Sequence, residues 1–247
     1  DVLAGRIALY AEQRVAGPDP EIEIAGRFAG AVLVALVRGR PEVTGPVPVP
    51  SWRGTESAAS ATTNRVRTVT VGSRDEALHA IGAAEPGDAI TFLPGTYRFD
   101  GAYIDVRQPG TPTAPISVRA EKPGTVVLEF NMHEGFLVSA PYWSFENLVI
   151  RGICADDSDC EHAFHVVAGA VHFAARDNEV VDFNAHFKVN GSGDAYPDFG
   201  VIEGNTLRNG SVRDTGNPVT LIDLVAASHW RIRGNRISDF VKGQSDR

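Results

Sequence analysis

Apolar residues in the second half of the chain recur in one repeated pattern. Each copy is an aromatic-led apolar run that reaches an asparagine and resumes with a β-branched residue or a leucine. The copies are WSFENLV (143–149), HFAARDNEVVDF (172–183), DFGVIEGNTL (198–207) and HWRIRGNRISDF (229–240). Their asparagines, Asn147, Asn178, Asn205 and Asn235, are separated by 31, 27 and 30 residues. Such intervals are typical of solenoids, whose units bury their apolar faces only by stacking.

The repeated asparagine predicts a ladder along this solenoid. Its amide carries both a donor and an acceptor, so a copy on one turn can bond to the copies above and below it. The pattern predicts an all-β fold, a parallel β-helix, over residues 66–247. Because the chain stops just after the fourth copy, we expect this solenoid to be incomplete at its C-terminus.

Residues 1–65 differ in character from the solenoid. The first fifteen have the pattern of an amphipathic helix, and FAGAVLVALV (28–37) is an apolar run between arginines. Ten residues are too few for a membrane span, so none is expected; the run suits the h-region of an export signal, or alternatively a short buried helix. The following stretch is rich in Pro, Ser, Thr and Ala, as linkers are. An export signal predicts a secreted, periplasmic or cell-surface protein.

The solenoid is expected to begin with a capping helix. TVTV (68–71) alternates as a strand, and Ser73 with Glu76 three residues later forms a capping box. This predicts a short helix over DEALHAIGAA (75–84), followed by a strand in PGDAITFLPGTY between two Pro-Gly turns. A helix laid over the first rung covers an edge that would otherwise be open.

Three strands are expected just before the asparagine-bearing runs. They are AFHVV (163–167), HFKVN (186–190) and LIDLV (221–225). Their alignment predicts two inward apolar columns, one of Phe164, Phe187 and Ile222 and one of Val166, Val189 and Leu224.

The residues between these columns are expected to point outward. Side chains alternate faces along a strand, and adjacent strands lie about 4.8 Å apart. His165, Lys188 and Asp223 are therefore predicted to form one column on the surface. His186 and Asn190 stand two residues on either side of Lys188, so they are expected to face the same way.

Composition limits the partners that this surface can have. The net charge is −8 over 247 residues, which argues against general nucleic-acid binding, because that requires a basic face. An acidic protein binds an anionic polymer only through a local cluster of cations. The chain has three lysines, Lys122, Lys188 and Lys242.

The first coils also carry a family resemblance. The runs ALHAIGAAEPGDAITFLPGTY (77–97), APISVRAEKPGTVVLEF (114–130) and GFLVSAPYWSFENLVIRGI (135–153) resemble the opening coils of the chondroitinase B and alginate lyase type of polysaccharide lyase. The resemblance covers about residues 70–153 and implies a right-handed parallel β-helix that cleaves uronic-acid polysaccharides by β-elimination. The catalytic Lys and Arg and the calcium-binding acids of those lyases lie in later coils and have no clear match here, so no residue is carried over.

The predicted outward column contains groups that β-elimination needs. The reaction requires neutralisation of the uronate carboxylate, a base, and an acid for the leaving oxygen. Lys188 fits the neutraliser or the base, His165 or His186 the acid, and Asp223 an orienting role. The alternative is that Lys188 and Asp223 form only a weak cross-strand ion pair.

Arg213 and Asn190 are candidates for substrate binding. Arg213 lies in the loop GSVRDTGNP, where its planar fork suits a carboxylate, although a solvated loop cation fits as well. Asn190 is the last residue of the strand HFKVN, two residues after Lys188.

The loop ICADDSDCEH offers a candidate calcium site. Asp156, Asp157, Asp159 and Glu161 cluster within six residues, and calcium prefers such hard oxygen ligands. The loop lacks the glycine and spacing of an EF-hand, so a merely solvated acidic turn is the alternative. The same loop holds both cysteines, Cys154 and Cys160, which suit a disulfide in an oxidising compartment or two thiols in a reducing one.

Two classes of function follow. The first is a carbohydrate-active enzyme, a polysaccharide lyase whose partner is an acidic polysaccharide. The second is a non-catalytic β-helix that binds glycans or serves as a structural module at the cell surface. Glycoside hydrolysis requires paired carboxylates, and only Asp223 lies in the outward column.

Overall fold

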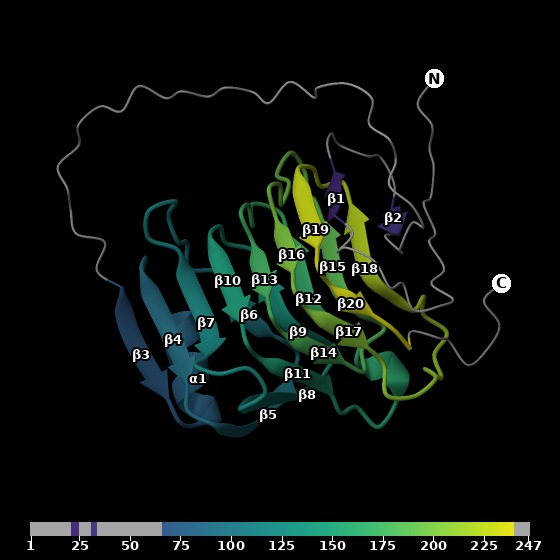
Figure 1. Ribbon diagram of the computed structural model, residues 1–247, viewed down its shortest axis with the longest axis horizontal. Coiled ribbons are helices and arrows are strands. Elements are labelled where there is room, and N and C mark those ends of the chain that lie inside the picture. The colour runs from purple at the N-terminus through teal and green to yellow at the C-terminus, as the bar shows by residue number, and fades with distance from the viewer. Residues whose placement is uncertain (1–20, 25–30, 34–65, 240–247) are drawn as a thin grey trace.

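The computed structural model of the chain describes residues 21–24, 31–33 and 66–239. The described part beyond residue 65 is a stack of coils that runs from β3 at one end to β18 and β19 at the other (Figure 1). The helix expected within residues 1–15, the linker at 41–64 and the last residues of the chain lie outside the described residues.

The coils form three parallel sheets. The first contains β3 (Arg67–Val71), β4 (Asp88–Phe92), β7 (Ile116–Ala120), β10 (Trp143–Glu146), β13 (Ala174–Arg176), β16 (Val201–Glu203) and β19 (Trp230–Arg233). The second contains β5 (Gly95–Gly101), β8 (Val126–Met132), β11 (Val149–Gly152), β14 (Glu179–Val181), β17 (Thr206–Arg208) and β20 (Arg236–Ile237). The third contains β6 (Ile104–Val106), β9 (Glu134–Val138), β12 (His162–Val167), β15 (Ala185–Asn190) and β18 (Thr220–Val225). Since neighbouring strands come from successive coils, the predicted parallel β-helix is confirmed.

Inward side chains of the three sheets form one continuous core. In the third sheet Phe164 pairs with Phe187 and Phe187 with Ile222, and all three are buried, as their spacing predicts. The rings of Phe164 and Phe187 stack with centroids 5.0 Å apart. Burial of such columns supplies the main driving force for stacking the coils.

The predicted capping helix is present as α1 (Arg74–Gly82). The Ser73 hydroxyl accepts from the Glu76 backbone N–H at 3.2 Å, and the Glu76 carboxylate accepts from the backbone N–H of Gly72 at 2.7 Å. Ala77 and Ile81 point into the core at the first rung. The helix therefore covers the apolar end of the stack.

The asparagine ladder has three members. Asn178 Nδ2 donates to Asn205 Oδ1, and Asn205 Nδ2 donates to Asn235 Oδ1, both at 3.0 Å. Each Oδ1 also accepts the backbone N–H of the ladder position one coil earlier.

Asn147 is not part of this ladder, so its inclusion was wrong by one residue. Leu148 occupies the ladder position, because its backbone N–H donates to Asn178 Oδ1 at 3.0 Å. Asn147 has a φ of 62° and corresponds to Gly204, with a φ of 68°, two coils later. Asparagine tolerates this left-handed conformation, which explains how it occupies the turn without joining the ladder.

Two segments from the first 65 residues extend the sheets. β1 (Glu21–Ile24) pairs antiparallel with β19, and β2 (Ala31–Leu33) pairs antiparallel with β18. The described part of the apolar run 28–37 is thus a strand and not a helix.

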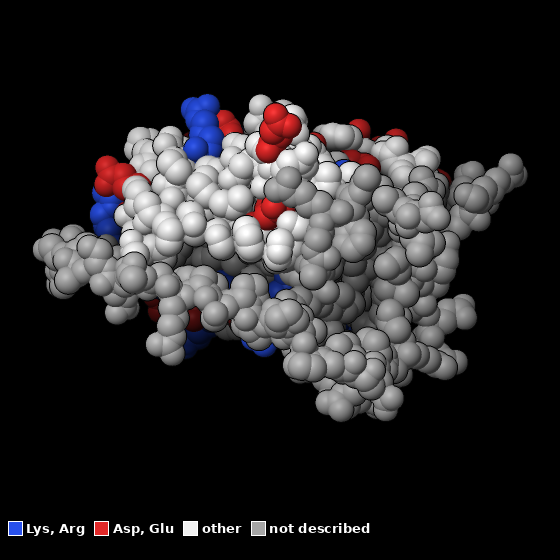
Figure 2. Space-filling model, turned by 90° about the horizontal axis from the view of Figure 1, so that it is seen from above, with Lys and Arg blue, Asp and Glu red and all other residues white. Residues whose placement is uncertain are grey.

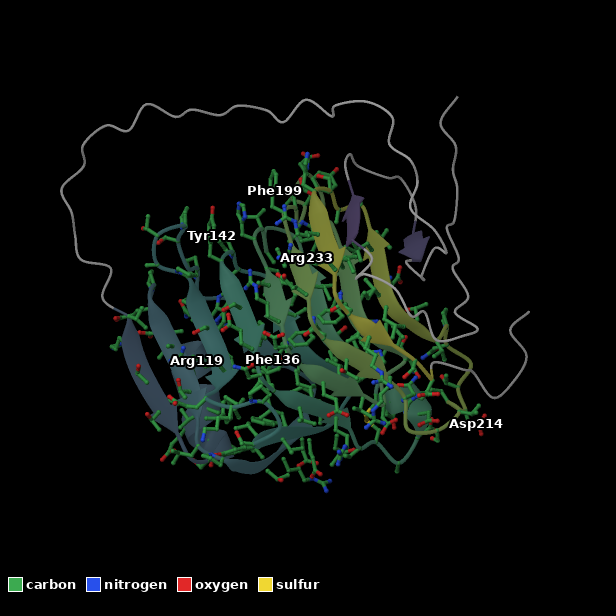
Figure 3. All side chains as sticks on the ribbon, in the orientation of Figure 1. Arg119, Phe136, Tyr142, Phe199, Asp214 and Arg233 are labelled. Atoms are coloured by element: carbon green, nitrogen blue, oxygen red, sulfur yellow. A yellow bond between two sulfur atoms is a disulfide. The ribbon has the colours of Figure 1, made fainter. Side chains whose placement is uncertain are left out.

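The outer face of the first sheet carries charges of alternating sign. Its column reads Arg119, Glu146, Arg176, Glu203 and Arg233, and the two ends, Arg119 and Arg233, are labelled in Figure 3. Arg233 Nε donates to Glu203 at 2.6 Å. The described surface visible in Figure 2 is mostly uncharged, and its basic groups lie beside acidic ones.

Rings also stack along the turns that precede this sheet. Tyr142, His172, Phe199 and His229 follow one another with centroids 4.8, 5.2 and 4.8 Å apart. Figure 3 shows Tyr142 and Phe199 along the upper rim of the coils. All four residues have positive φ, so one backbone turn is repeated on successive coils.

Removing one member of the ladder should destabilise the stack. Asn205→Ala deletes an amide that is fully buried. It removes the bonds that Asn205 Oδ1 accepts from the backbone N–H and Nδ2 of Asn178 and the bond that Asn205 Nδ2 donates to the Ala175 carbonyl. We expect the free energy of unfolding to fall by roughly 3 kcal/mol, measured by urea denaturation. Asn131→Ala, which removes an exposed bond to Asp100, is the matched control and should cost no more than about 0.5 kcal/mol. Equal effects of the two substitutions would argue against a structural role of the ladder.

Candidate functional site

The predicted outward column exists on the third sheet. His165 pairs with Lys188, and Lys188 pairs with Asp223, in the register that the sequence predicted. Lys188 Nζ donates to Asp223 Oδ2 at 2.6 Å, and the two side chains are 26% and 16% exposed. The column is therefore half-buried and holds an ammonium beside a carboxylate.

His165 is held at both ring nitrogens. Nδ1 lies 2.8 Å from Glu134 Oε1, and Nε2 lies 2.8 Å from Asn190 Oδ1. Burial by itself lowers the pKa of His165, but the hydrogen bonds to Glu134 and Asn190 outweigh it and raise the pKa above its ordinary value. Asn190 thus faces outward as expected, and it fixes the ring of His165.

Glu134 and His162 complete this cluster, and the sequence analysis missed both. Glu134 is paired with His162 on the neighbouring strand, and Glu134 Oε1 lies 3.5 Å from His162 Nδ1. The adjacent imidazoles, His162 first and then His165, hold the pKa of Glu134 well below its usual range. Extending the strand alignment one coil back, to EGFLV (134–138), pairs Leu137 with His165, and strict alternation from Leu137 would have turned Glu134 inward. Alternation in the sequence therefore does not find Glu134.

His186 does not face outward, so that prediction was wrong. Alternation is interrupted in β12 and β15: in β15 both His186 and Phe187 are buried, as are Ala163 and Phe164 in β12. The side chain of His186 is 0% exposed and Nε2 donates to the Arg208 carbonyl at 3.1 Å. Burial lowers the pKa of His186 to about 3, which keeps the ring neutral. His186 therefore cannot reach a substrate on the outer face.

Arg213 is also an interior residue and not a solvated or substrate-binding loop cation. Its side chain is buried, pairs with Asp157 Oδ1 at 2.7 Å and donates to Asn184 Oδ1 at 3.1 Å. The guanidinium therefore ties its own loop to the acidic loop between β11 and β12. Asp214 beside it, labelled in Figure 3, donates its backbone N–H to Asp157 at 2.7 Å.

Acidic side chains of this loop bind other parts of the protein. The Asp156 carboxylate caps a short 3-10 helix at Asp157–Asp159 by accepting from the Ser158 N–H. Glu161 Oε2 accepts from Asn184 and Asn217. Cys154 and Cys160 form a disulfide that closes the loop. Calcium binding by Asp156, Asp157, Asp159 and Glu161 stays a prediction.

A groove of the described part offers no cation for an anionic polymer. A groove of about 560 Å³ lies on another face, where Asn147, Asp177, Glu179 and Thr206 are among its lining residues. None of the residues that line it is basic. The half-buried ammonium of Lys188 is better suited to bind a polymer of carboxylates.

Comparisons with known proteins find similar solved structures. An alginate lyase from Paenibacillus sp. str. FPU-7 is 16% identical, with a TM-score of 0.49, over 72% of this chain and 69% of that one. A PL6 family polysaccharide lyase from Pseudopedobacter saltans is 17% identical, with a TM-score of 0.44, over 61% and 40%. The PL6 family alginate lyase AlyGC is 18% identical, with a TM-score of 0.43, over 62% and 22%.

Alginate lyases and a polysaccharide lyase are thus among the solved structures to which the chain is similar. The chain spans less than half the length of AlyGC and of the Pseudopedobacter enzyme. No family model matches the chain, and no curated protein matches it. Within the described residues, no helix has the length and apolar character needed to cross a membrane.

The buried His186 should make the protein sensitive to acid. Because its pKa is about 3 when folded and near 6.5 when unfolded, only the unfolded chain takes up a proton between these values. Titration of His186 therefore leaves the free energy of unfolding unchanged above about pH 6.5. Below that pH it lowers the free energy of unfolding by up to about 1.4 kcal/mol per pH unit. His186→Leu should flatten this part of the curve of unfolding free energy against pH.

Leucine suits this position, since Leu221 is the corresponding buried residue one coil later. The exposed His79 offers a control, and His79→Gln should keep the wild-type slope. A His186→Leu protein with the wild-type slope between pH 6 and pH 4 would contradict the assignment.

Proposed function

We propose that the protein is a polysaccharide lyase that cleaves uronic-acid-containing glycans by β-elimination, and that the outward column of the third sheet binds the substrate. The observation that carries this proposal is the half-buried ammonium of Lys188, held by Asp223 on one neighbouring rung and adjacent to His165 on the other. The resemblance of residues 70–153 to β-helical lyases supports the same assignment.

Lys188 meets the first requirement of the reaction. The proton alpha to a uronate carboxylate becomes acidic enough to remove only when the negative charge of that carboxylate is neutralised. An ammonium has three donors, and Asp223 Oδ2 takes one of them. The remaining N–H groups of Lys188 can bind the uronate while Asp223 keeps the ammonium in place.

The neighbouring residues position this group. The ring of His165 is fixed by Glu134 and Asn190, so it forms a rigid wall of the column beside Lys188. Because the strands stack at about 4.8 Å, a linear polymer lying along the third sheet meets polar groups on successive rungs. The column thus fits a repeating acidic polymer.

We also place the protein in a secreted, periplasmic or cell-surface location. The disulfide between Cys154 and Cys160 supports this proposal, since disulfides persist mainly in oxidising compartments.

Substitution of Lys188 tests the proposal. The full chain is assayed on alginate, chondroitin, dermatan and pectate, and the ultraviolet absorbance of the unsaturated product is followed. We expect Lys188→Ala to lower kcat/KM at least about 100-fold, because it removes the charge that stabilises the transition state. Lys122→Ala is the matched control. It removes an exposed lysine from the turn between β7 and β8 and should keep full activity.

The outcome also separates the two classes of function. Polysaccharide binding that is weakened by Lys188→Ala, without product from the wild-type chain, would identify a glycan-binding module in place of a lyase. Product formation that survives Lys188→Ala in a correctly folded protein would rule out this column as the catalytic site. Circular dichroism of each variant establishes that the fold is kept.

A further inference from the structure

Glu134, His162 and His165 bring three metal-ligand atoms together on the third sheet. The three side chains come from β9 and β12, and their ligand atoms all lie within 4.8 Å of one another. The interruption of alternation at Ala163 and Phe164 turns His162 and His165 to the same side although they are three residues apart. The coil geometry therefore creates a cluster that a regular strand would not.

One atom of this cluster lacks a hydrogen bond. His162 Nδ1 is buried and has no partner among the described residues, and it lies 3.5 Å from Glu134 Oε1. A buried polar atom without a partner costs roughly 1–3 kcal/mol, so its persistence calls for a ligand. The nearest charged oxygen, Glu134 Oε1, is the atom that also contacts His165 Nδ1 at 2.8 Å.

The second nitrogen of His165 is arranged as in metal sites. Nε2 lies 2.8 Å from Asn190 Oδ1, which can only accept, so Nε2 carries its hydrogen toward Asn190. Metal-binding histidines donate their other ring N–H in this way, which fixes the tautomer and directs the free nitrogen to the ion. In His165 that nitrogen is Nδ1, on the side of Glu134.

The separations are close to those of a tetrahedral zinc site. Bonds of about 2.0–2.1 Å to nitrogen and 2.0–2.2 Å to oxygen place tetrahedral ligand atoms roughly 3.4 Å apart. The two contacts of Glu134 Oε1, at 2.8 and 3.5 Å, lie on either side of this value.

The donor set selects the class of metal. Two imidazole nitrogens and one carboxylate suit zinc and similar divalent transition metals, whereas calcium takes six to eight oxygen ligands. The side chains of Glu134, His162 and His165 are 19%, 14% and 18% exposed, so the cluster is sheltered but reachable from solvent. Three protein ligands leave the fourth position to a solvent molecule.

We propose that Glu134, His162 and His165 bind one divalent transition-metal ion of the zinc class, with Asn190 orienting His165. The site shares the face of the Lys188 column, but neither Lys188 nor Asp223 is a ligand. Metal binding is therefore measured without substrate and is independent of whether the protein is a lyase.

Calorimetric titration of the chelator-stripped full chain with zinc chloride tests the proposal. We expect saturable binding of one ion per chain and a higher melting temperature with zinc. His162→Gln and Glu134→Gln should each weaken binding at least 100-fold, while Asn190→Ala should weaken it about 10- to 100-fold. Two controls should bind zinc as the wild-type chain does: Lys188→Ala, and His133→Gln, which removes an exposed neighbouring histidine.

Cobalt in place of zinc gives a second readout. Tetrahedral coordination by the wild-type chain should produce visible absorption bands that are lost in His162→Gln. Absence of one-to-one binding by the wild-type chain overturns the proposal. Unchanged binding by both His162→Gln and Glu134→Gln overturns it as well, and so does a loss of binding in His133→Gln equal to theirs. Circular dichroism ensures that each variant is compared in its folded form.

Discussion

The structure depends on the fixed register between successive coils. From β4 to β18 each coil contributes one strand to each sheet, and these strands pair in parallel with their counterparts on the neighbouring coils. A coil by itself has no partner for its backbone groups or its apolar side chains, so stacking satisfies both at once. Since the register is set, residues at equivalent positions are brought into columns, whether they are apolar, amide-bearing or charged.

The site follows from the same register together with one departure from it. Parallel pairing alone places Lys188 between His165 and Asp223. The interruption of alternation within β12 and β15 then turns His162 outward and His186 inward. Gly135 occupies the corresponding position in β9, where a Cβ would overlap the Ala163 carbonyl. A polar cluster on the surface and a buried histidine are therefore two results of one backbone irregularity.

Much of this arrangement could be predicted from periodicity, and the errors have local causes. The inward columns of Phe164 and Val166 and the outward Lys188 follow from strict alternation, which holds over that part of each strand. His186 was placed wrongly because the interruption lies between it and Lys188. Asn147 was placed in the ladder because it is one residue away from Leu148, and spacing in a sequence does not reveal which residue adopts a positive φ.

The sequence by itself determined the repeat, the sheets that the repeat builds, the capping helix and the face to which most strand residues point. These are consequences of local patterns, because side chains in a strand alternate with a period of two residues. Only the tertiary structure decided which distant groups meet: Glu134 with His162 and His165, and Arg213 with Asp157 across 56 residues. Such contacts depend on how far each side chain reaches across rungs and on where alternation is interrupted, and neither is encoded in a local pattern.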